Sequence, residues 1–463
     1  MAQTTNNKQR LTVKGMVRQI LVIGASAAGI EAAAAARKKD RTAEITLITQ
    51  EKTAGYSRCG LPFVIGGHIS SFRDLVVYPP AFFQMQKLVL RTQTKVMAIS
   101  TKDKTLTIQT KENITQTLPY DALVIATGAE PYMPPIAGRE KQGILSLRNI
   151  EDGEKIDAAI KAGAESALIL GAGLIGLELS VGLKERGLKV TVVEMLPQIL
   201  PQFLDADMAK LVQQHLEERG ITILLNQGVE EILGEFQVNA IKTNSEVLKA
   251  DLIISAFGVR ASTKLAKEAG IPLGETQAIK TNARMETEIK DVYAVGDCAE
   301  APSVITHRPI CAQLGTIAVR EGKVAGTNAG GDYSLFGGVL ASAVTQLFDI
   351  QAANTGLTQT AAHRNRIEVI SATVSSKTRA SYFPGAKPIK IKLVVEKESQ
   401  RIIGAQIVGG EEVTQRINGI SFAIQQGMTI RELAKADTAY APPLCETWEP
   451  MVLAAEMILM KLR

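Results

Sequence analysis

The sequence predicts an α/β protein with two Rossmann-like units, followed by a C-terminal α+β domain. Two glycine-rich segments support this prediction, because each follows an apolar run of the length of a strand. The first segment covers residues 24–29 and follows residues 20–23, and the second covers residues 171–176 and follows residues 167–170. Two such units in one chain imply two dinucleotides that exchange electrons.

Each glycine-rich segment has residues suited to three physical tasks. Its first glycine permits a tight turn, its middle small residue lets backbone approach a pyrophosphate, and its last glycine lets helix and strand pack closely. The N-terminus of the following helix offers unpaired N–H groups to the anion. The residues assigned to these tasks are Gly24, Ser26, Ala27 and Gly29 in the first segment, and Gly171, Gly173 and Gly176 in the second.

Each segment also opens a strand-loop-helix-strand unit. In the first unit an alanine-rich run up to Arg37 predicts the helix, and residues 44–49 predict the next parallel strand. In the second unit residues 177–186 predict the helix, Gly187 ends it, and residues 189–194 predict the next strand. The chain therefore repeats an architecture rather than a detailed sequence.

The pattern changes in the last third of the chain. Residues 389–396 begin with the alternation of a half-exposed antiparallel strand, and residues 401–409 predict its neighbour. Helical patterns follow over residues 414–426 and 449–462. We therefore expect a separate α+β domain from about residue 334.

Length, composition and charge exclude several classes of function. A chain of 463 residues exceeds a single hydrophobic core and indicates about three domains. The net charge is +5, and the 52 basic and 47 acidic residues are spread along the chain, so nothing indicates a nucleic-acid surface. No apolar run reaches the roughly 20 residues that a membrane-spanning helix needs. We expect neither a nucleic-acid partner nor a membrane association.

The cysteines and the N-terminus indicate the cellular setting. The four cysteines are too few and too scattered for a disulfide framework or a zinc site, so we expect no metal and a reducing cytoplasm. Residues 1–16 lack the apolar core of a signal peptide and are expected to form a disordered tail.

Glu194 bears on the choice of nicotinamide cofactor. It ends the strand after the second glycine-rich segment, where a carboxylate can accept hydrogen bonds from both ribose hydroxyls. Residues 195–198 contain no Arg or Lys for a 2′-phosphate, which favours NADH over NADPH. In the first unit Glu51 either binds the ribose in the same way or is a solvated loop carboxylate.

Two further segments complete a recognisable pattern. Residues 121–128 predict a buried strand ending in the small turn Thr127-Gly128, and residues 291–297 end on Asp297. With the two glycine-rich segments, they make the chain resemble the pyridine nucleotide-disulfide oxidoreductase family over nearly its whole length. The resemblance implies that the first unit binds FAD, with Asp297 on the ribitol of the flavin, and that the second binds NAD(P)H.

The resemblance also implies the domain bounds and a homodimer. Residues 251–258 look like a variant of a family strand that ends at the nucleotide site, here at Gly258. The implied domains are an FAD-binding domain of residues 17–145 and 263–333, an NAD(P)H-binding domain of residues 146–262, and a C-terminal dimerisation domain of residues 334–463.

Cys59 decides the branch of the family. Two-cysteine members carry a second cysteine five residues later, where this chain has Val64. The chain thus resembles the single-cysteine branch of coenzyme A-disulfide reductases, persulfide reductases, NADH oxidases and NADH peroxidases. Oxidase and peroxidase members usually have a histidine where this chain has Ala27, which counts against oxygen or peroxide as substrate. We expect the flavin and a nearby helix terminus to lower the pKa of the Cys59 thiol.

Five further residues are assigned by the same resemblance. Tyr382 and Tyr440 fall where coenzyme A-disulfide reductases place two tyrosines that reach the cysteine of the partner subunit. A phenol there can protonate a leaving thiolate. Lys38, Arg58 and Lys87 align with positions that line the coenzyme A channel, although each alone is also typical of a solvated surface cation.

The C-terminal turn departs from the family pattern. Leu444-Cys445 replaces a Tyr-Ser pair, and Glu449-Pro450 replaces an Asp-Pro pair. Cys445 is interpreted as a packing residue in place of serine, and the alternative is a second redox thiol that reaches the partner's Cys59.

The sequence therefore predicts a homodimeric, FAD-dependent enzyme that passes electrons from NADH through the flavin to Cys59. The expected substrate is a low-molecular-weight disulfide or persulfide, such as one of coenzyme A. The alternatives are an NADH oxidase acting through a Cys59 sulfenate, and a flavin redox sensor with little turnover. An electron transferase to a small iron–sulfur partner is disfavoured, because proteins of that kind generally lack the cysteine.

Overall fold

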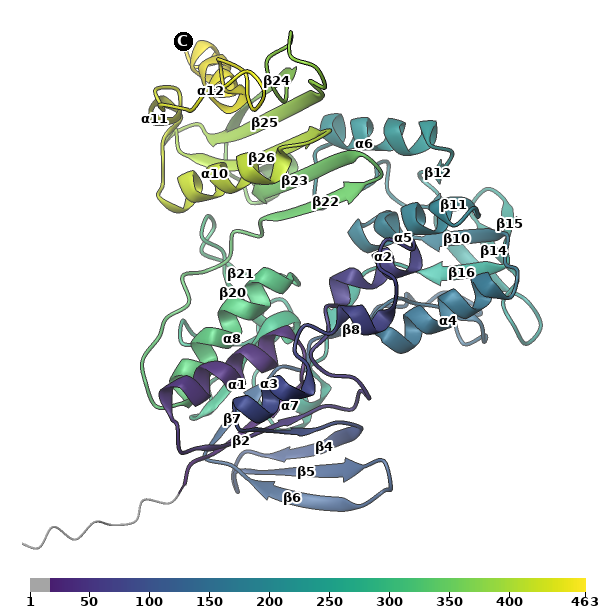
Figure 1. Ribbon diagram of the computed structural model, residues 1–463, viewed down its shortest axis with the longest axis vertical. Coiled ribbons are helices and arrows are strands. Elements are labelled where there is room, and N and C mark those ends of the chain that lie inside the picture. Colours follow the sequence, from purple (N-terminus) through teal and green to yellow (C-terminus); the bar gives the residue numbers. More distant parts are fainter. Residues whose placement is uncertain (1–16) are drawn as a thin grey trace, which may run out of the picture.

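The computed structural model describes residues 17–463, which form three parts (Figure 1). The tail expected over residues 1–16 lies outside the described residues. In Figure 1 the part with α1 (Ala27–Lys39) and α8 (Gly315–Ala329) lies at the bottom, the part with α4 (Ile150–Lys161) and α5 (Leu174–Glu185) at the right, and the C-terminal part at the top. This confirms the predicted fold class.

The first part is built on a parallel sheet in the order β19-β7-β1-β2-β3. Its strands are β1 (Gln19–Ile23), β2 (Glu44–Ile48), β3 (Leu88–Arg91), β7 (Ala122–Ile125) and β19 (Val292–Ala294). Helices α1 (Ala27–Lys39) and α8 (Gly315–Ala329) pack together at glycines. A β-carbon on Gly326 would lie 2.0 Å from the carbonyl oxygen of Ala32, so no larger residue fits there.

Smaller elements surround this sheet. The strands are β4 (Thr94–Ser100), β5 (Thr105–Thr110) and β6 (Thr115–Pro119) in one sheet, and β18 (Ile279–Lys280), β20 (Ala299–Pro302) and β21 (Pro309–Ile310) in another. The helices are α3 (Pro80–Met85) and α7 (Lys264–Glu268), with the 3₁₀ turn η3 (Gly296–Cys298). The turn η1 (Arg58–Gly60) leads into α2 (Leu61–Ile65), which packs with η2 (Phe72–Leu75) against α4 and α5 of the second part instead.

The second part repeats the plan with a parallel sheet in the order β12-β11-β10-β16-β9. Its strands are β9 (Ile144–Leu145), β10 (Ser166–Leu170), β11 (Lys189–Val193), β12 (Thr222–Leu224) and β16 (Leu252–Ser255). Its other elements are α4 (Ile150–Lys161), α5 (Leu174–Glu185), α6 (Ala206–Glu218), β13 (Val229–Leu233), β14 (Ala240–Thr243) and β15 (Val247–Lys249). The sequence predicts that this domain begins at residue 146. Because β9 (residues 144–145) pairs with β16, the chain joins the second sheet slightly earlier.

A two-stranded antiparallel ribbon joins the first two parts. It consists of β8 (Ala129–Pro131) and β17 (Val259–Ala261), one on each crossing of the chain. The carboxyl ends of both Rossmann-like sheets therefore lie next to the same connection.

The C-terminal part is an antiparallel sheet in the order β22-β23-β26-β25-β24. Its strands are β22 (Ala343–Leu347), β23 (Ile350–Gly356), β24 (Val369–Lys377), β25 (Pro388–Glu396) and β26 (Ile402–Gly409). Its helices are α9 (Gln359–Arg364), α10 (Val413–Gln425), α11 (Ile430–Leu433) and α12 (Pro450–Lys461). The buried apolar faces of α10, α11 and α12 form one core with the sheet, and Ala362 of α9 packs in a smaller cluster.

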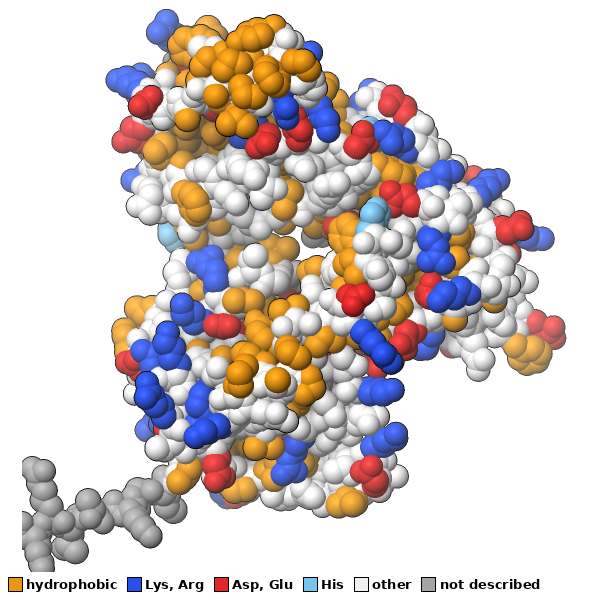
Figure 2. Space-filling model, in the orientation of Figure 1, with side chains coloured by type: hydrophobic (Ala, Val, Ile, Leu, Met, Phe, Trp, Pro, Cys, Tyr) orange, Lys and Arg blue, Asp and Glu red, His pale blue; other side chains and the backbone are white. Residues whose placement is uncertain are grey.

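Apolar side chains gather on the outer surface of this C-terminal part, at the top of Figure 2. Its exposed large apolar residues include Tyr382, Phe422, Tyr440, Leu444, Trp448, Met457 and Met460. Such a concentration is typical of a surface that a protein partner covers. Within residues 17–463, no helix is both long and apolar enough to cross a membrane.

A buried ion pair fastens the second part to the C-terminal sheet. Lys392 Nζ on β25 lies 3.1 Å from Asp205 at the start of α6, and the two side chains are only 7% and 6% exposed. Gln406 on β26 also donates to the Asp205 carboxylate, at 2.6 Å. The nucleotide-binding unit is thus held against the C-terminal domain.

Candidate active site

The first glycine-rich loop requires glycine at both of its ends. Gly24 has a φ of +106°, and a β-carbon there would lie 2.1 Å from the carbonyl oxygen of Ala126 at the end of β7. A β-carbon on Gly29 would lie 2.0 Å from the carbonyl oxygen of Gly24. These contacts bring α1 close to the carboxyl edge of the sheet.

The N-terminus of α1 is free to bind an anion. Ser26 is the N-cap residue, its side chain makes no capping hydrogen bond, and the first turn, which begins with Ala27, has no acidic residue. The first N–H groups of this 13-residue helix therefore have no intrahelical acceptor and point toward the loop. An FAD pyrophosphate fits this arrangement.

The second glycine-rich loop has the same construction and more open space. Gly171 has a φ of +117°, and a β-carbon on Gly176 would lie 2.3 Å from its carbonyl oxygen. A β-carbon on Gly173, by contrast, would meet no atom within 4 Å. Gly173 is also the N-cap of α5, which no side chain caps. The loop therefore leaves room for a second pyrophosphate at a free helix N-terminus.

Glu194 lies beside this second loop, as a ribose-binding acid should. Its carboxylate accepts hydrogen bonds from the N–H groups of Ala172 and Leu196, both at 2.9 Å, and the residue is 9% exposed. The two bonds fix the direction of the carboxylate and leave further lone pairs for hydroxyl groups.

The predicted strand ends meet at the junction of the two nucleotide-binding parts. Thr127 Oγ1 donates to the carbonyl oxygen of Ser262 at 2.7 Å. Gly128 and Gly258 have φ values of +69° and +98°, and a β-carbon on Gly258 would meet no atom within 4 Å. These residues leave backbone exposed where the two cofactors would approach each other.

Asp297 is paired with a cation that the sequence analysis missed. Nη2 of Arg148 donates to Asp297 Oδ2 at 2.7 Å, and both side chains are less than one-fifth exposed. Nε of Arg148 donates to the carbonyl oxygen of Ala129 in the ribbon. Arg148 therefore connects the expected flavin-binding acid to the start of the second domain, a long-range contact with no local signal in the sequence.

Glu321 on α8 is a second residue that the sequence analysis missed. It is 3% exposed and accepts a hydrogen bond from the N–H of Gly296 at 2.8 Å, directly before Asp297. Its burial raises the pKa of the Glu321 carboxyl to about 8. It therefore supports the turn that carries Asp297.

Cys59 lies in the 3₁₀ turn η1 and is exposed to solvent. Protein atoms on its inner side nevertheless remove part of its hydration, which raises the pKa of the thiol. The carboxylates of Glu178 and Asp297 add to the rise, and the charge of Arg148 opposes it. The protein without flavin thus raises the pKa that we expected to fall. The expected effect of a helix terminus is small, because the helix after Cys59, α2, has only five residues. The negative charges of the two acids act against a thiolate.

The side chain of Arg58 points inward rather than into an open channel. Its guanidinium forms an ion pair with Glu51 and donates to the carbonyl oxygen of Arg148 at 2.6 Å. Tyr56 also donates to Glu51, at 2.6 Å. The carboxylate of Glu51 is therefore engaged by two side chains beside Cys59, which counts against free ribose binding. The inward contacts of Arg58 likewise count against a place in the coenzyme A channel.

Lys38 and Lys87 remain exposed and lie on adjoining segments. Arg37 on α1 donates to the carbonyl oxygens of Gln86 and Lys87, at 3.0 and 2.9 Å. These bonds join the end of α1, which carries Lys38, to the turn that carries Lys87. The two ammonium groups are available to an anionic ligand.

Tyr382 and Tyr440 meet on the surface of the C-terminal domain. Their hydroxyl oxygens are 2.9 Å apart, and the residues are 73% and 44% exposed. The hydrogen bond with Tyr440 raises the pKa of Tyr382. Two loops far apart in the sequence thus present one pair of phenols.

Cys445 is engaged within its own turn. Its Sγ accepts from the N–H of Ala441 at 3.3 Å and donates to the carbonyl oxygen of Ala439 at 3.2 Å. These two residues flank Tyr440, so the thiol closes the turn as a serine hydroxyl would. The contacts favour the packing interpretation over the redox one.

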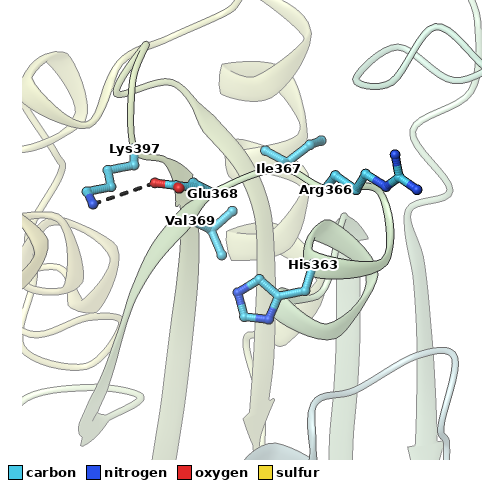
Figure 3. A pocket seen from close by; sticks show the side chains of 6 residues that line it. All are labelled: His363, Arg366, Ile367, Glu368, Val369 and Lys397. Atoms are coloured by element: carbon cyan, nitrogen blue, oxygen red, sulfur yellow. Dashed lines mark ion pairs between the residues drawn. The ribbon is translucent and has the colours of Figure 1, made fainter.

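A separate hollow lies at the edge of the C-terminal domain (Figure 3). Its lining residues are His363, Arg366, Ile367, Glu368, Val369 and Lys397, and the only ion pair drawn among them joins Lys397 to Glu368 at 3.6 Å. None of the predicted site residues lines it. Among residues 17–463, no group of three His, Cys, Asp or Glu side chains could hold a metal ion.

Comparison with known proteins agrees with these features. Residues 18–322 match the family described as pyridine nucleotide-disulphide oxidoreductase, and residues 342–452 match its dimerisation domain. An NADH oxidase of Methanocaldococcus jannaschii is 42% identical over 444 residues, which cover 96% of this chain and 99% of that protein. An NAD(P)H coenzyme A polysulfide/persulfide reductase of Pyrococcus horikoshii is 31% identical, with coverage of 96% and 99%.

A solved structure shows the same similarity. An NAD-dependent persulfide reductase from A. fulgidus superimposes with a TM-score of 0.92 at 38% identity. The match covers 96% of this chain and 83% of that one.

Proposed function

Because the chain belongs to the pyridine nucleotide-disulfide oxidoreductase family, we propose that it uses NADH to reduce a low-molecular-weight disulfide or persulfide at Cys59. The observation that carries the proposal is the position of Cys59. The residue before it, Arg58, binds the carbonyl oxygen of Arg148, and Arg148 in turn binds Asp297. The turn that carries Cys59 is therefore connected through Arg148 to Asp297, the acid that the family uses to hold the flavin.

FAD and NADH each have a suitable cradle. The free N-terminus of α1 would hold the FAD pyrophosphate and Asp297 its ribitol, while the loop around Gly173 and the Glu194 carboxylate would hold NADH. When bound, FAD would supply the chemistry that turns a hydride donor into a source of electrons for sulfur. The remaining steps belong to residues of this chain.

Cys59 as a thiolate attacks one sulfur of the substrate S–S bond. A mixed disulfide forms on Cys59, the S–S bond of the substrate breaks, and the other half leaves as a thiolate. Two electrons and one proton then release the bound half as a thiol and return Cys59 to the thiolate.

Arg148 and the tyrosine pair control the charges in this exchange. The pKa of Cys59 is raised in the flavin-free protein, so its thiol is mostly protonated at neutral pH, and Arg148 is the cation that favours the thiolate. The leaving thiolate needs a proton, which the exposed phenols of Tyr382 and Tyr440 can donate across the dimer. Lys38 and Lys87 would attract the phosphates of a coenzyme A substrate.

The preferred donor in this proposal is NADH rather than NADPH. In this proposal the adenosine ribose binds the Glu194 carboxylate, which two backbone bonds hold in place; Met195 next to it is 69% exposed and apolar. A 2′-phosphate would meet a carboxylate and no cation from residues 195–198. We place this reaction in the cytoplasm, where reduced thiols are maintained.

The second candidate function is that of an NADH oxidase. The similarity to the Methanocaldococcus jannaschii NADH oxidase favours it. Ala27 counts against it, because the first turn of α1 then offers no acid or base beside the flavin site. A redox sensor would share the fold and show slow turnover.

A substrate panel separates these functions. Flavin-loaded dimer is given NADH with coenzyme A disulfide, coenzyme A persulfide, polysulfide, peroxide or oxygen, and NADH oxidation is followed anaerobically except in the oxygen arm. The proposal predicts the highest kcat/KM with a sulfur substrate. The highest value with oxygen would establish the oxidase, and slow turnover with every acceptor would establish the sensor.

A further inference from the structure

A buried ion pair connects the loops that carry the two tyrosines. Arg416 on α10 and Glu449 immediately before α12 are 6% and 8% exposed. Nε of Arg416 donates to Glu449 Oε1 at 2.8 Å, and Nη2 donates to Oε2 at 3.3 Å. A buried ion pair contributes little net stability, because desolvation offsets its attraction. Its position therefore calls for another explanation.

The same guanidinium holds the base of the loop that carries Tyr382. Nη2 of Arg416 also donates to the carbonyl oxygen of Thr378, at 3.3 Å. Thr378 is fully buried, and it closes the loop through two hydrogen bonds with Lys387, at 2.9 and 3.1 Å. Arg416 thus reaches the root of the segment from which Tyr382 projects.

Glu449 marks the end of the loop that carries Tyr440. It is the N-cap residue of α12, but its side chain makes no capping hydrogen bond with that helix. The carboxylate turns instead to Arg416, while the backbone carbonyl of Glu449 accepts from the first turn of α12. The departure from the Asp-Pro pattern thus places a longer acid where the loop rejoins the core.

Two direct contacts join the loops nearer their tips. The N–H of Ala380 donates to the carbonyl oxygen of Pro442 at 3.2 Å, and the hydroxyls of Tyr382 and Tyr440 are 2.9 Å apart. The Arg416–Glu449 pair adds a third tie at the buried ends of the loops.

We propose that Arg416 and Glu449 are positioning residues for the tyrosine pair. The buried ion pair holds the two loops in one relative position and thereby directs both phenols toward the substrate at the partner's Cys59. This inference rests on the proposed function, which assigns proton donation to the tyrosines. Side chains as exposed as these depend on their loops for alignment, and a misplacement of about 1 Å can lower a rate by about 100-fold.

Two conservative variants test the pair. Arg416→Lys keeps the charge, but one ammonium cannot bind both carboxylate oxygens and the Thr378 carbonyl oxygen. Glu449→Gln keeps the shape and removes the charge. For both we expect kcat/KM for coenzyme A disulfide to fall by about tenfold or more. NADH-dependent reduction of ferricyanide should not change, because it needs only the flavin.

A matched control separates positioning from stability. Lys392→Met breaks a different buried ion pair of the C-terminal sheet, the one that joins it to Asp205 of the second part and includes no residue of either tyrosine loop. It should lower the thermal midpoint at least as much as Arg416→Lys does, with disulfide turnover preserved. An equal loss of disulfide turnover in Lys392→Met, or none in both Arg416→Lys and Glu449→Gln, would overturn the inference.

A readout independent of turnover completes the test. Photo-oxidation should couple the two neighbouring phenols into dityrosine, found by mass spectrometry as a crosslink between the peptides of Tyr382 and Tyr440. Its yield should fall in Arg416→Lys and stay normal in Lys392→Met.

Full disulfide turnover in both Tyr382→Phe and Tyr440→Phe would refute proton donation by the tyrosines. Impaired tyrosine variants beside an unaffected Arg416→Lys would refute only the positioning role.

Discussion

The cofactor preference assigned to Glu194 can be removed by a single substitution, Glu194→Gln. Glu194→Gln keeps an acceptor oxygen for one of the N–H groups of Ala172 and Leu196, and removes the negative charge. The other N–H group loses its acceptor and faces the new amide NH2 group, which adds to the loss expected with NADH. The kcat/KM for NADPH should rise, because the 2′-phosphate of NADPH no longer meets a like charge.

The expected gain follows from Coulomb's law. Two unit charges about 4 Å apart repel by about 4 kcal/mol at an effective dielectric constant of about 20. Solvent and salt at the open side of the nucleotide site screen about half of this, which leaves about 2 kcal/mol. That energy corresponds to about a 30-fold rise in kcat/KM for NADPH. NADH should lose about tenfold, because a charged hydrogen bond to its ribose becomes a neutral one.

The assay is steady-state NADH and NADPH oxidation at a saturating disulfide concentration and constant ionic strength. The unmutated enzyme should prefer NADH, and Glu194→Gln should use the two donors with similar efficiency. Raising the salt concentration should narrow the preference of the unmutated enzyme more than that of the variant. Equal efficiency with both donors before mutation, or an unchanged ratio after it, would refute the reasoning.

Four further predictions concern the thiol and the domain contact. Cys59→Ser should keep FAD and the dimer but lose disulfide reduction, while slow oxygen reduction by the flavin persists; retained disulfide turnover would remove Cys59 from the reaction. In the flavin-free protein, alkylation of Cys59 by iodoacetamide should rise only above the ordinary thiol pKa, because a raised pKa moves thiolate formation to higher pH. Arg148→Gln should move that profile to still higher pH, whereas a shift to lower pH would contradict the charge that we assign to Arg148. Lys392→Met should lower the free energy of unfolding by about 3–5 kcal/mol, because it leaves Asp205 buried without its cation. An unchanged urea midpoint would show that this contact contributes nothing.

The elements that the sequence predicted are those set by local periodicity. The strands that precede each glycine-rich loop formed where expected, although the second helix begins at Leu174 rather than at residue 177. The strand over residues 389–396 also formed, but the prediction that it is half-exposed was wrong, because β25 lies inside the sheet and is almost fully buried. Gly24 and Gly171 were predictable for the same reason, since their turn geometry is encoded in a short segment.

Contacts between distant segments could not be predicted in this way. Arg148 binds Asp297 across 149 positions of the chain, and Arg416 binds Glu449 across 33. The sequence around a single Arg or Lys does not indicate which acidic residue it will bind. The inward direction of Arg58 was missed for a different reason: its partner Glu51 is only 7 positions away, in the loop that leads into η1, but the sequence alone does not show that this loop turns the two side chains toward each other.

The thiol pKa shows a further limit of sequence reasoning. The motif around Cys59 indicates a reactive residue, but the pKa of its thiol is raised first by burial and then by the charge of Glu178, which comes from the second Rossmann-like unit. Only the assembled fold places this carboxylate near the sulfur. A bound flavin would then be one of the groups that lower the pKa of the Cys59 thiol again.

The central claim is that Cys59 carries half of the substrate during turnover. Flavin-loaded dimer is mixed anaerobically with coenzyme A disulfide, quenched with acid, digested and analysed by mass spectrometry, with and without a chase of NADH. We predict a coenzyme A adduct on the peptide that contains Cys59, and its loss within a turnover after NADH is added. Absence of the adduct, or an adduct that NADH does not remove, would contradict the account.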